Sequence, residues 1–303
     1  MSRLYKYKDC IVKFLKDRCC IQESKNKEII TKQILNVDPL LAIVLLTIMN
    51  SQQKKHNLTS QGYYAASSIL ILQLYCNTNI DDKSCIINYA TKSLWQNLNL
   101  FQNNIQDVTK RSNIIQNVMN YYFNNINGIT NMPDEQIEFD GKPNVDVKKW
   151  YIKEDRMLEH FNSLQKIKIE SYNKLIMGQM IKVVEMAVFI GFMLGGGDVK
   201  DTTKLTKLVT YYAHFYKLYI DFINLEDDLN KTTKYSTNYV INYGILNSYE
   251  TFMSNKQKFI EECMLKDMYT STIKEIVNYI SSSVDQIIDE TSPDLRSNAS
   301  SMT

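Results

Sequence analysis

The chain has 303 residues, of which 44% are hydrophobic and 22% are charged, and its formal net charge is +2. This length and apolar content allow a large buried core and exclude a disordered chain. The small net charge argues against nucleic acid as the main partner.

Helices are predicted along almost the whole chain, because apolar residues recur near i, i+3, i+4 and i+7 and strand-like alternation is sustained nowhere. Only 9 glycines and 4 prolines interrupt this pattern, which favours long helices over a β architecture with many turns. The predicted helices span residues 5–20, 39–49, 62–75, 84–101, 113–124, 151–194, 202–229, 248–262 and 269–289.

The main interruption is the segment 124–149, where turn-forming pairs such as Asn127-Gly128 and Lys142-Pro143 cluster. The composition on its two sides is the same, so we predict a long loop within one helical domain over residues 1–290 rather than a domain linker. Residues 291–303 are rich in Ser and Asn and are predicted to form a flexible tail.

The cysteines and the apolar runs bear on the environment of the protein. The six cysteines form no C-x-x-C pair and are accompanied by only three histidines, which argues against a zinc site. No signal peptide is recognised at the N-terminus, so we expect a cytoplasmic protein with reduced thiols. The apolar runs 40–49 and 183–194 are shorter than the ~20 residues that cross a bilayer, so we predict buried core helices and no transmembrane segment.

The most informative segment is a row of acidic and amide side chains that ends an aromatic helix. Asp221, Asn224 and Asp228 recur at i, i+3 and i+7, which would place them on one face of a helix. Their oxygens are ligands of the kind that Mg²⁺ prefers, and Lys231 and Lys234 follow within reach of a phosphate carried by such a metal. The row therefore indicates a diphosphate-magnesium site, and a solvated acidic helix end is the alternative.

The sequence around this row resembles a known family. Residues 215–224 read F-Y-K-L-Y-I-D-F-I-N, which resembles the second aspartate-rich segment, F-Q-x-x-D-D-x-x-D, of the trans-isoprenyl diphosphate synthase (polyprenyl synthetase) family. In the best register Lys217 takes the Gln position and Ile220 takes the position of the first Asp. Asp221 and Asn224 take the positions of the second and third Asp.

The family's first aspartate-rich segment, D-D-x-x-D with basic residues beyond it, has a counterpart at residues 103–107, which read N-N-I-Q-D before Lys110 and Arg111. The leading amides keep an acceptor oxygen but lose the charge that holds a divalent metal. An Asn-rich polar helix end is the alternative interpretation. Asp81-Asp82 is a rival segment, but it lacks a third acid and precedes an apolar-periodic run, so we interpret it as a helix cap.

Other segments of the family are matched more weakly. Residues 185–197 resemble its small-residue helix upstream of the second acid segment. The basic G-G-K-x-x-R-P segment falls near residues 61–67, which contain neither Lys nor Arg, and a Lys-Thr pair of the family falls on Gln179-Met180. The resemblance covers roughly residues 40–245 in order.

The resemblance implies an all-α fold, an isoprenoid synthase-like helical bundle around a central apolar cavity, with residues 103–107 and 221–228 facing each other across it. It also implies an isoprenoid diphosphate as ligand and a homo- or heterodimer. Magnesium would bind weakly, mainly with bound diphosphate. The implied metal ligands are Asp107, Asp221, Asn224 and Asp228, and the implied substrate-binding cations are Lys110, Arg111, Lys217 and Lys231.

The departures from the family pattern bear on activity. Losing one contact to a developing charge costs on the order of 10²-fold in rate, so several such losses are expected to impair or abolish chain elongation. We consider two hypotheses. The first is a magnesium-dependent prenyltransferase of isoprenoid biosynthesis that binds or condenses allylic and isopentenyl diphosphates with an altered metal set. The second is a catalytically silent partner subunit, and an unrelated helical scaffold is a further alternative.

Overall fold

The computed structural model describes residues 3–18, 32–34, 37–52, 60–77, 84–101, 107–130, 137–144, 146–147, 154–231 and 233–291. Within these ranges the chain is mainly helical and contains no strand. The extended backbone there pairs only in isolated bridges, antiparallel between Phe139 and Ile167 and parallel between Gln165 and Tyr235. The predicted all-α class is confirmed.

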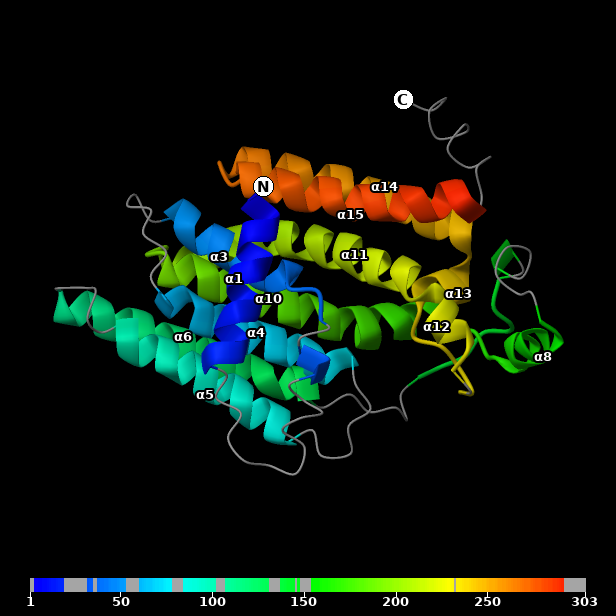
Figure 1. Ribbon diagram of the computed structural model, residues 1–303, viewed down its shortest axis with the longest axis horizontal. Helices are drawn as coiled ribbons and strands as arrows, with labels where there is room; N and C mark the ends of the chain where they lie inside the picture. Colours follow the sequence, from blue (N-terminus) through cyan, green and yellow to red (C-terminus); the bar gives the residue numbers. More distant parts are fainter. Residues whose placement is uncertain are drawn as a thin grey trace. The chain divides into compact units, whose positions relative to one another are not determined.

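Most helices lie where the sequence predicts them, with ends displaced by a few residues (Figure 1). The main helices of the described residues are α1 (Arg3–Arg18), α3 (Leu40–Gln52), α4 (Ser60–Asn77), α5 (Ser84–Phe101), α6 (Val108–Thr130), α8 (Asp155–Ser163), α9 (Ile169–Ser171), the π-helix η2 (Tyr172–Met177), α10 (Gly178–Leu194), the 3-10 helix η3 (Val199–Leu205), α11 (Thr206–Ile223), α12 (Leu225–Leu229), α13 (Tyr239–Tyr243), α14 (Ile245–Leu265) and α15 (Ser271–Thr291).

Several predicted boundaries are wrong. The segment predicted as a loop from residue 124 continues as helix α6 to residue 130, because Ile126 and Ile129 are buried and extend its apolar face. The helix predicted over 151–194 is divided, since Gln165 and Ile167 lie in the extended bridges. The short helix α13 is not predicted, and residues 292–303 of the predicted tail lie outside the described ranges.

The helix predicted over 202–229 is also interrupted. Helix α11 ends at Ile223, and Asn224 has φ −102° and ψ 9°, outside the helical region, before α12 begins. The carbonyl oxygen of Asp221, an acceptor for the next helical turn, accepts a hydrogen bond from the side-chain amide of Asn238 (2.8 Å). A side chain that enters the helical hydrogen-bond ladder is a common cause of such a break.

The chain forms two compact units. Unit 1 comprises Met1–Asn131, Lys182–Val209 and Lys266–Ile276, and unit 2 comprises Met132–Ile181, Thr210–Leu265 and Val277–Thr303. The single domain predicted over residues 1–290 stays a prediction, because a compact unit is not by itself an independently folding one.

Unit 1 is built on helix α3, in which every residue from Leu40 to Met49 is buried. Helix α3 contacts α4, α4 contacts α5, and α1 contacts both α3 and α4. The C-terminal half of α10 approaches α3 very closely. A Cβ atom at Gly191 would lie 2.7 Å from the carbonyl oxygen of Leu45, and one at Gly195 would lie 2.5 Å from that of Met49. The absence of side chains at these glycines therefore lets the two backbones approach.

The segment Ile169–Leu194 is long and apolar enough to cross a bilayer by length and composition alone. However, 72% of its most apolar window is buried inside the molecule. This burial is typical of a core helix, in agreement with the prediction for residues 183–194. The segment begins with the short helix α9, and the π-helix η2 follows. In η2 the N–H of Gly178 bonds the carbonyl of Asn173, five residues earlier.

Unit 2 has an aromatic core on helix α11, which lies beside α14 and the C-terminal part of α15 (Figure 1). The ring centroids of Tyr212 and Phe259 are 4.8 Å apart, as are those of Phe215 and Phe252. Aromatic pairs at these distances add roughly 0.5–1.5 kcal/mol each beyond the burial of their area. The aromatic residues before Asp221 therefore serve to pack unit 2.

The close approach of α10 to α3 generates a prediction. Gly191→Ala should lower the free energy of unfolding by roughly 1–3 kcal/mol, because the new methyl group meets the backbone of Leu45, which has no flexible end to move aside. The control is Gly178→Ala, where the nearest atom is 3.8 Å away, and there we expect a change of about 0.4–1 kcal/mol in the stabilising direction. Urea denaturation of both variants measures this difference, and equal midpoints would contradict the close approach.

Candidate functional site

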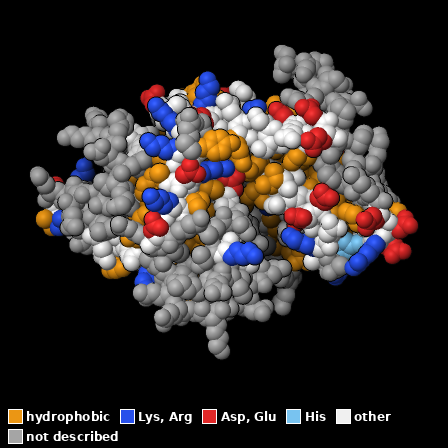
Figure 2. Space-filling model, in the orientation of Figure 1, with side chains coloured by type: hydrophobic (Ala, Val, Ile, Leu, Met, Phe, Trp, Pro, Cys, Tyr) orange, Lys and Arg blue, Asp and Glu red, His pale blue; other side chains and the backbone are white. Residues whose placement is uncertain are grey.

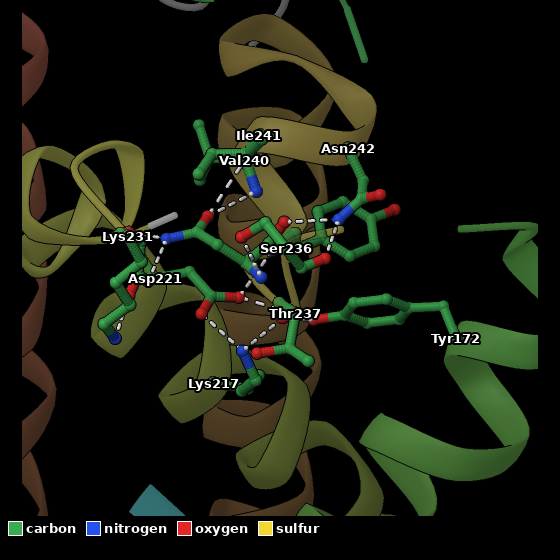
Figure 3. A network of polar contacts seen from close by, with 12 residues as sticks. Tyr172, Lys217, Asp221, Lys231, Ser236, Thr237, Val240, Ile241 and Asn242 are labelled. Carbon is green, nitrogen blue, oxygen red and sulfur yellow. Dashed lines mark hydrogen bonds and ion pairs between the residues drawn. The ribbon is translucent and has the colours of Figure 1, made fainter. Parts of the chain in front are cut away.

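Asp221 lies at the centre of a buried polar cluster in unit 2. Its side chain is almost fully buried, and its Oδ1 accepts a hydrogen bond from Nζ of Lys217, one helical turn earlier on α11. Its Oδ2 accepts from the backbone N–H of Tyr239 (2.9 Å) and from the hydroxyl of Tyr172 (3.4 Å). Both oxygens of the carboxylate are therefore occupied by protein donors (Figure 3).

Lys217 is the internal cation of this cluster. It is 9% exposed, and its Nζ also donates to the carbonyl oxygen of Thr237 (3.2 Å). The same Nζ lies 6.0 Å from the centroid of the Tyr172 ring, a cation–π distance. In the family pattern this position holds a neutral Gln, so the lysine adds a positive charge beside the one matched carboxylate.

The ionisation of the cluster follows from its burial. Burial raises the pKa of Asp221 above its usual value, although Lys217 and the N–H of Tyr239 act in the opposite direction, and Asp228 raises it further. Burial also raises the pKa of Tyr172 well above that of a free tyrosine, and the nearby carboxylate of Asp221 adds to the shift. Tyr172 is therefore a neutral hydrogen-bond donor.

Asp228 joins the same cluster through Asn238. Oδ1 of Asp228 pairs with Nζ of Lys231 (2.6 Å), and its Oδ2 accepts from Nδ2 of Asn238 (2.9 Å). The Oδ1 of Asn238 accepts from the N–H groups of Val240 (2.9 Å) and Ile241 (3.4 Å) and so caps helix α13. Sequence reasoning missed Asn238, although an Asn directly before an apolar run is a known sign of a helix start.

A second buried amide extends the network toward the extended bridges. Oδ1 of Asn242 accepts from the N–H of Ile167 (2.8 Å), and its Nδ2 donates to the carbonyl oxygens of Ser236 (2.7 Å) and Asn238 (2.8 Å). The hydroxyl of Tyr243 donates to the carbonyl of Ile167 (2.9 Å). These contacts fix the turn that carries Asn238 and Tyr239, and Figure 3 shows Asn242 directed toward Ser236.

The continuous helix assumed for the predicted row of three ligands is interrupted at Asn224, and the metal-binding role of Asp221, Asn224 and Asp228 stays a prediction. Asn224 lies at the break between α11 and α12, is partly exposed and makes no side-chain cap. The acids Glu226, Asp227 and Asp228 occupy the first turn of α12, where negative charge is favourable at a helix N-terminus. The prediction from helix periodicity assumed one continuous helix, whereas the structure has two helices that meet at residue 224.

Magnesium does not fit this cluster as the structure shows it. The two carboxylates are matched by the ammonium groups of Lys217 and Lys231, so the four side chains sum to zero charge. Each oxygen of Asp221 and Asp228 already has a protein partner. In the described part of the chain, no group of three or more His, Cys, Asp or Glu residues is placed to hold a metal ion.

The first acid segment is described only in part. Residues 103–106 lie outside the described ranges. Asp107 is exposed, and its Oδ1 accepts from the backbone N–H of Lys110 (3.0 Å) at the start of α6, as a helix cap does. The side chain of Lys110 is exposed and that of Arg111 is partly exposed. These residues belong to unit 1, and their predicted approach to the second segment across one cavity stays a prediction.

The buried ion pair generates a stability prediction. Lys217→Met should cost about 3–5 kcal/mol of unfolding free energy, because it leaves the buried carboxylate of Asp221 without its cation. The double change Lys217→Met with Asp221→Asn should cost less than the single change. The control Lys231→Met should cost under about 1 kcal/mol, since the side chain of Lys231 is 63% exposed. Denaturant titration measures the unfolding free energies of these variants. Equal losses for Lys217→Met and Lys231→Met would contradict the prediction.

The pKa of Asp221 generates a pH prediction. Because burial raises this pKa in the folded state, the folded chain binds the proton more tightly than the unfolded chain does. Its contribution to stability is therefore full below the unfolded pKa and is lost as the pH rises through the folded pKa. The stability of the wild type relative to Asp221→Asn should increase as the pH falls from 7 toward 4. A difference that shrinks on acidification, measured by thermal melts, would show that the pKa is lowered instead.

No protein-family model matches the chain, and no curated protein matches it in sequence. Solved structures do match. A geranyltransferase from Helicobacter pylori matches with a TM-score of 0.56 and 12% identity over 93% of this chain and 96% of that one. A form of the Helicobacter pylori enzyme complexed with magnesium and isoprenyl diphosphate matches with a TM-score of 0.55 and 12% identity, over 94% of this chain and 99% of that one. The geranyl diphosphate synthase small subunit from Antirrhinum majus matches with a TM-score of 0.53 and 11% identity, over 93% of this chain and 100% of that one. The chain therefore has the all-α fold of the trans-isoprenyl diphosphate synthases.

Proposed function

We propose that this chain is an isoprenoid synthase-fold protein that has lost magnesium-dependent chain elongation. The observation that carries the proposal is the buried pair of Lys217 with Asp221, repeated at the surface by Lys231 with Asp228. In the family that the sequence resembles, aspartates of this segment hold magnesium on the diphosphate. Here the corresponding oxygens accept hydrogen bonds from protein donors.

The energetic argument concerns the displacement of Lys217. A metal ion can reach the oxygens of Asp221 only if the ammonium group leaves them. Breaking a buried ion pair costs about 3–5 kcal/mol, which corresponds to a loss of roughly two to three and a half powers of ten in metal affinity. Magnesium binding at this segment is therefore proposed to be weak and to require the charge of a bound diphosphate.

The proposal is tested by an elongation assay. The wild type is incubated with magnesium, isopentenyl diphosphate and allylic diphosphates of increasing length, and we expect no extended product. The geranyltransferase from Helicobacter pylori serves as the positive control. Turnover by the wild type that is abolished by Asp221→Asn would overturn the proposal, because it would require the paired carboxylate to act.

A gain-of-binding variant tests the physical reason. Lys217→Gln combined with Ile220→Asp removes the internal cation and restores the first acid of the family pattern, so calorimetry with magnesium and pyrophosphate should show affinity about tenfold or more above that of the wild type. The control Lys207→Gln removes one charge from an exposed lysine of unit 1, outside the acid cluster, and it should change little. If the double variant binds no better than the wild type, the ion pair is not what limits metal binding.

A second candidate function is that of a partner subunit. Its support is the similarity to the small subunit of geranyl diphosphate synthase from Antirrhinum majus, which spans all of that chain. In this role the chain would assemble with an active isoprenyl diphosphate synthase, as a heterodimer or larger complex, and would change its product. Co-expression with such a synthase from the same source, followed by light scattering and product analysis, tests this. Separate species with unchanged products would exclude the subunit role for that synthase.

A further inference from the structure

Unit 1 contains a cavity of its own, with a volume of about 520 Å³. This volume is within the roughly 300–1,000 Å³ of small-molecule sites. The walls come from α1, the C-terminal end of α3, the start of α4 and the connection between α14 and α15. The lining residues include Arg3, Lys6, Cys10, Asn50, Tyr63 and Thr270.

The charge of the cavity is positive. Arg3 and Lys6 line it from consecutive turns of α1, and among the described residues no acidic side chain lines it. The nearby carboxylate of Glu275 is engaged, because its Oε2 accepts from the N–H of Leu4 (2.9 Å). The side chain of Lys6 forms no hydrogen bond or ion pair with the described part of the chain. On the face drawn in Figure 2, Lys and Arg side chains lie near the N-terminal part of α1, with Asp and Glu side chains among them.

The uncharged groups of the cavity are suited to a hydroxylated ligand. Thr270 and Tyr63 supply hydroxyl groups, and burial keeps Tyr63 a neutral donor by raising its pKa. Nδ2 of Asn50 donates to the hydroxyl of Tyr7 (3.3 Å), whereas its Oδ1 is buried and has no hydrogen-bond partner within the described ranges. A buried acceptor without a donor costs roughly 1–3 kcal/mol, so a rotation of the Asn50 side chain that brings Oδ1 to the cavity and to a ligand hydroxyl group would be favourable.

We propose that this cavity binds a small organic phosphate that carries hydroxyl groups, of the size of a sugar phosphate or a mononucleotide. The phosphate lies between the guanidinium of Arg3 and the ammonium of Lys6, whose donors match its oxygens. A hydroxyl group of the ligand donates to Oδ1 of Asn50. The two cations supply the neutralising charge, so binding requires no metal ion and is independent of the acid cluster in unit 2.

Calorimetry without magnesium tests the site with three probes: glucose 6-phosphate, AMP and inorganic phosphate. At least one organic phosphate should bind, and more tightly than inorganic phosphate, which has no hydroxylated body to reach Asn50. Arg3→Gln and Lys6→Gln should each weaken this binding about tenfold or more. Both side chains are exposed, so the variants should fold. The control Lys207→Gln removes the same charge from an exposed lysine of unit 1 outside the cavity and should leave the affinity unchanged.

The thiol of Cys10 gives a readout at the cavity itself. Cys10 lines the cavity and is partly exposed, whereas the partly exposed Cys85 on α5 does not line it, and neither cysteine forms a disulfide. The bound organic phosphate should slow the alkylation of Cys10 by iodoacetamide, measured by peptide mass spectrometry, and leave Cys85 unaffected. The proposal is overturned if neither organic phosphate binds, if both cation variants bind as the wild type does, or if Cys10 is not protected at saturation.

Discussion

The arrangement of unit 2 around its acid segment depends on one buried charge pair. Lys217 and Asp221 lie one turn apart on α11, and each also bonds the backbone of the segment 237–239. Neither charge is tolerable in the interior without the other. The pair therefore joins α11 to the turn before α13, and the position of Asn238 follows from it. From there Asn238 bonds the carbonyl of Asp221 near the end of α11 and caps helix α13.

The functional meaning of the cluster follows from where its positive charge comes from. A metal-binding acid segment keeps its carboxylates open and receives cations from solution. In this chain the cations are covalent parts of the protein, at Lys217 and Lys231, and cannot be exchanged. The polar residues that resemble a metal-binding segment thus join α11 to the turn before α13.

Much of the fold could be predicted from the sequence, because helices leave a periodic pattern and unit 1 has strongly apolar ones such as α3. Lys217 and Asp221 are spaced at i and i+4, so their pairing on one helix is also predictable from the sequence. The contacts with Tyr172 and Thr237 could not be predicted, since they join segments distant in sequence. The break at Asn224 escaped prediction for the same reason, because its cause is a side chain from residue 238. The glycines near the C-terminal end of α10 could be seen in the sequence, but the sequence did not show that the backbone of α3 packs against them.

The π-helix η2 has a consequence for aligning this chain with its structural neighbours. A π turn contains about one residue more than an α turn, so the residues after Met177 are rotated relative to a count made along an uninterrupted α-helix. Against a neighbour with an uninterrupted α-helix at this turn, matching by residue number would displace the later positions of α10 by about one. Gln179-Met180, which the resemblance pairs with the family's Lys-Thr, lies directly beyond this turn. Superposition of the backbones, with a one-residue gap placed within η2, is the sounder basis for comparing positions on either side.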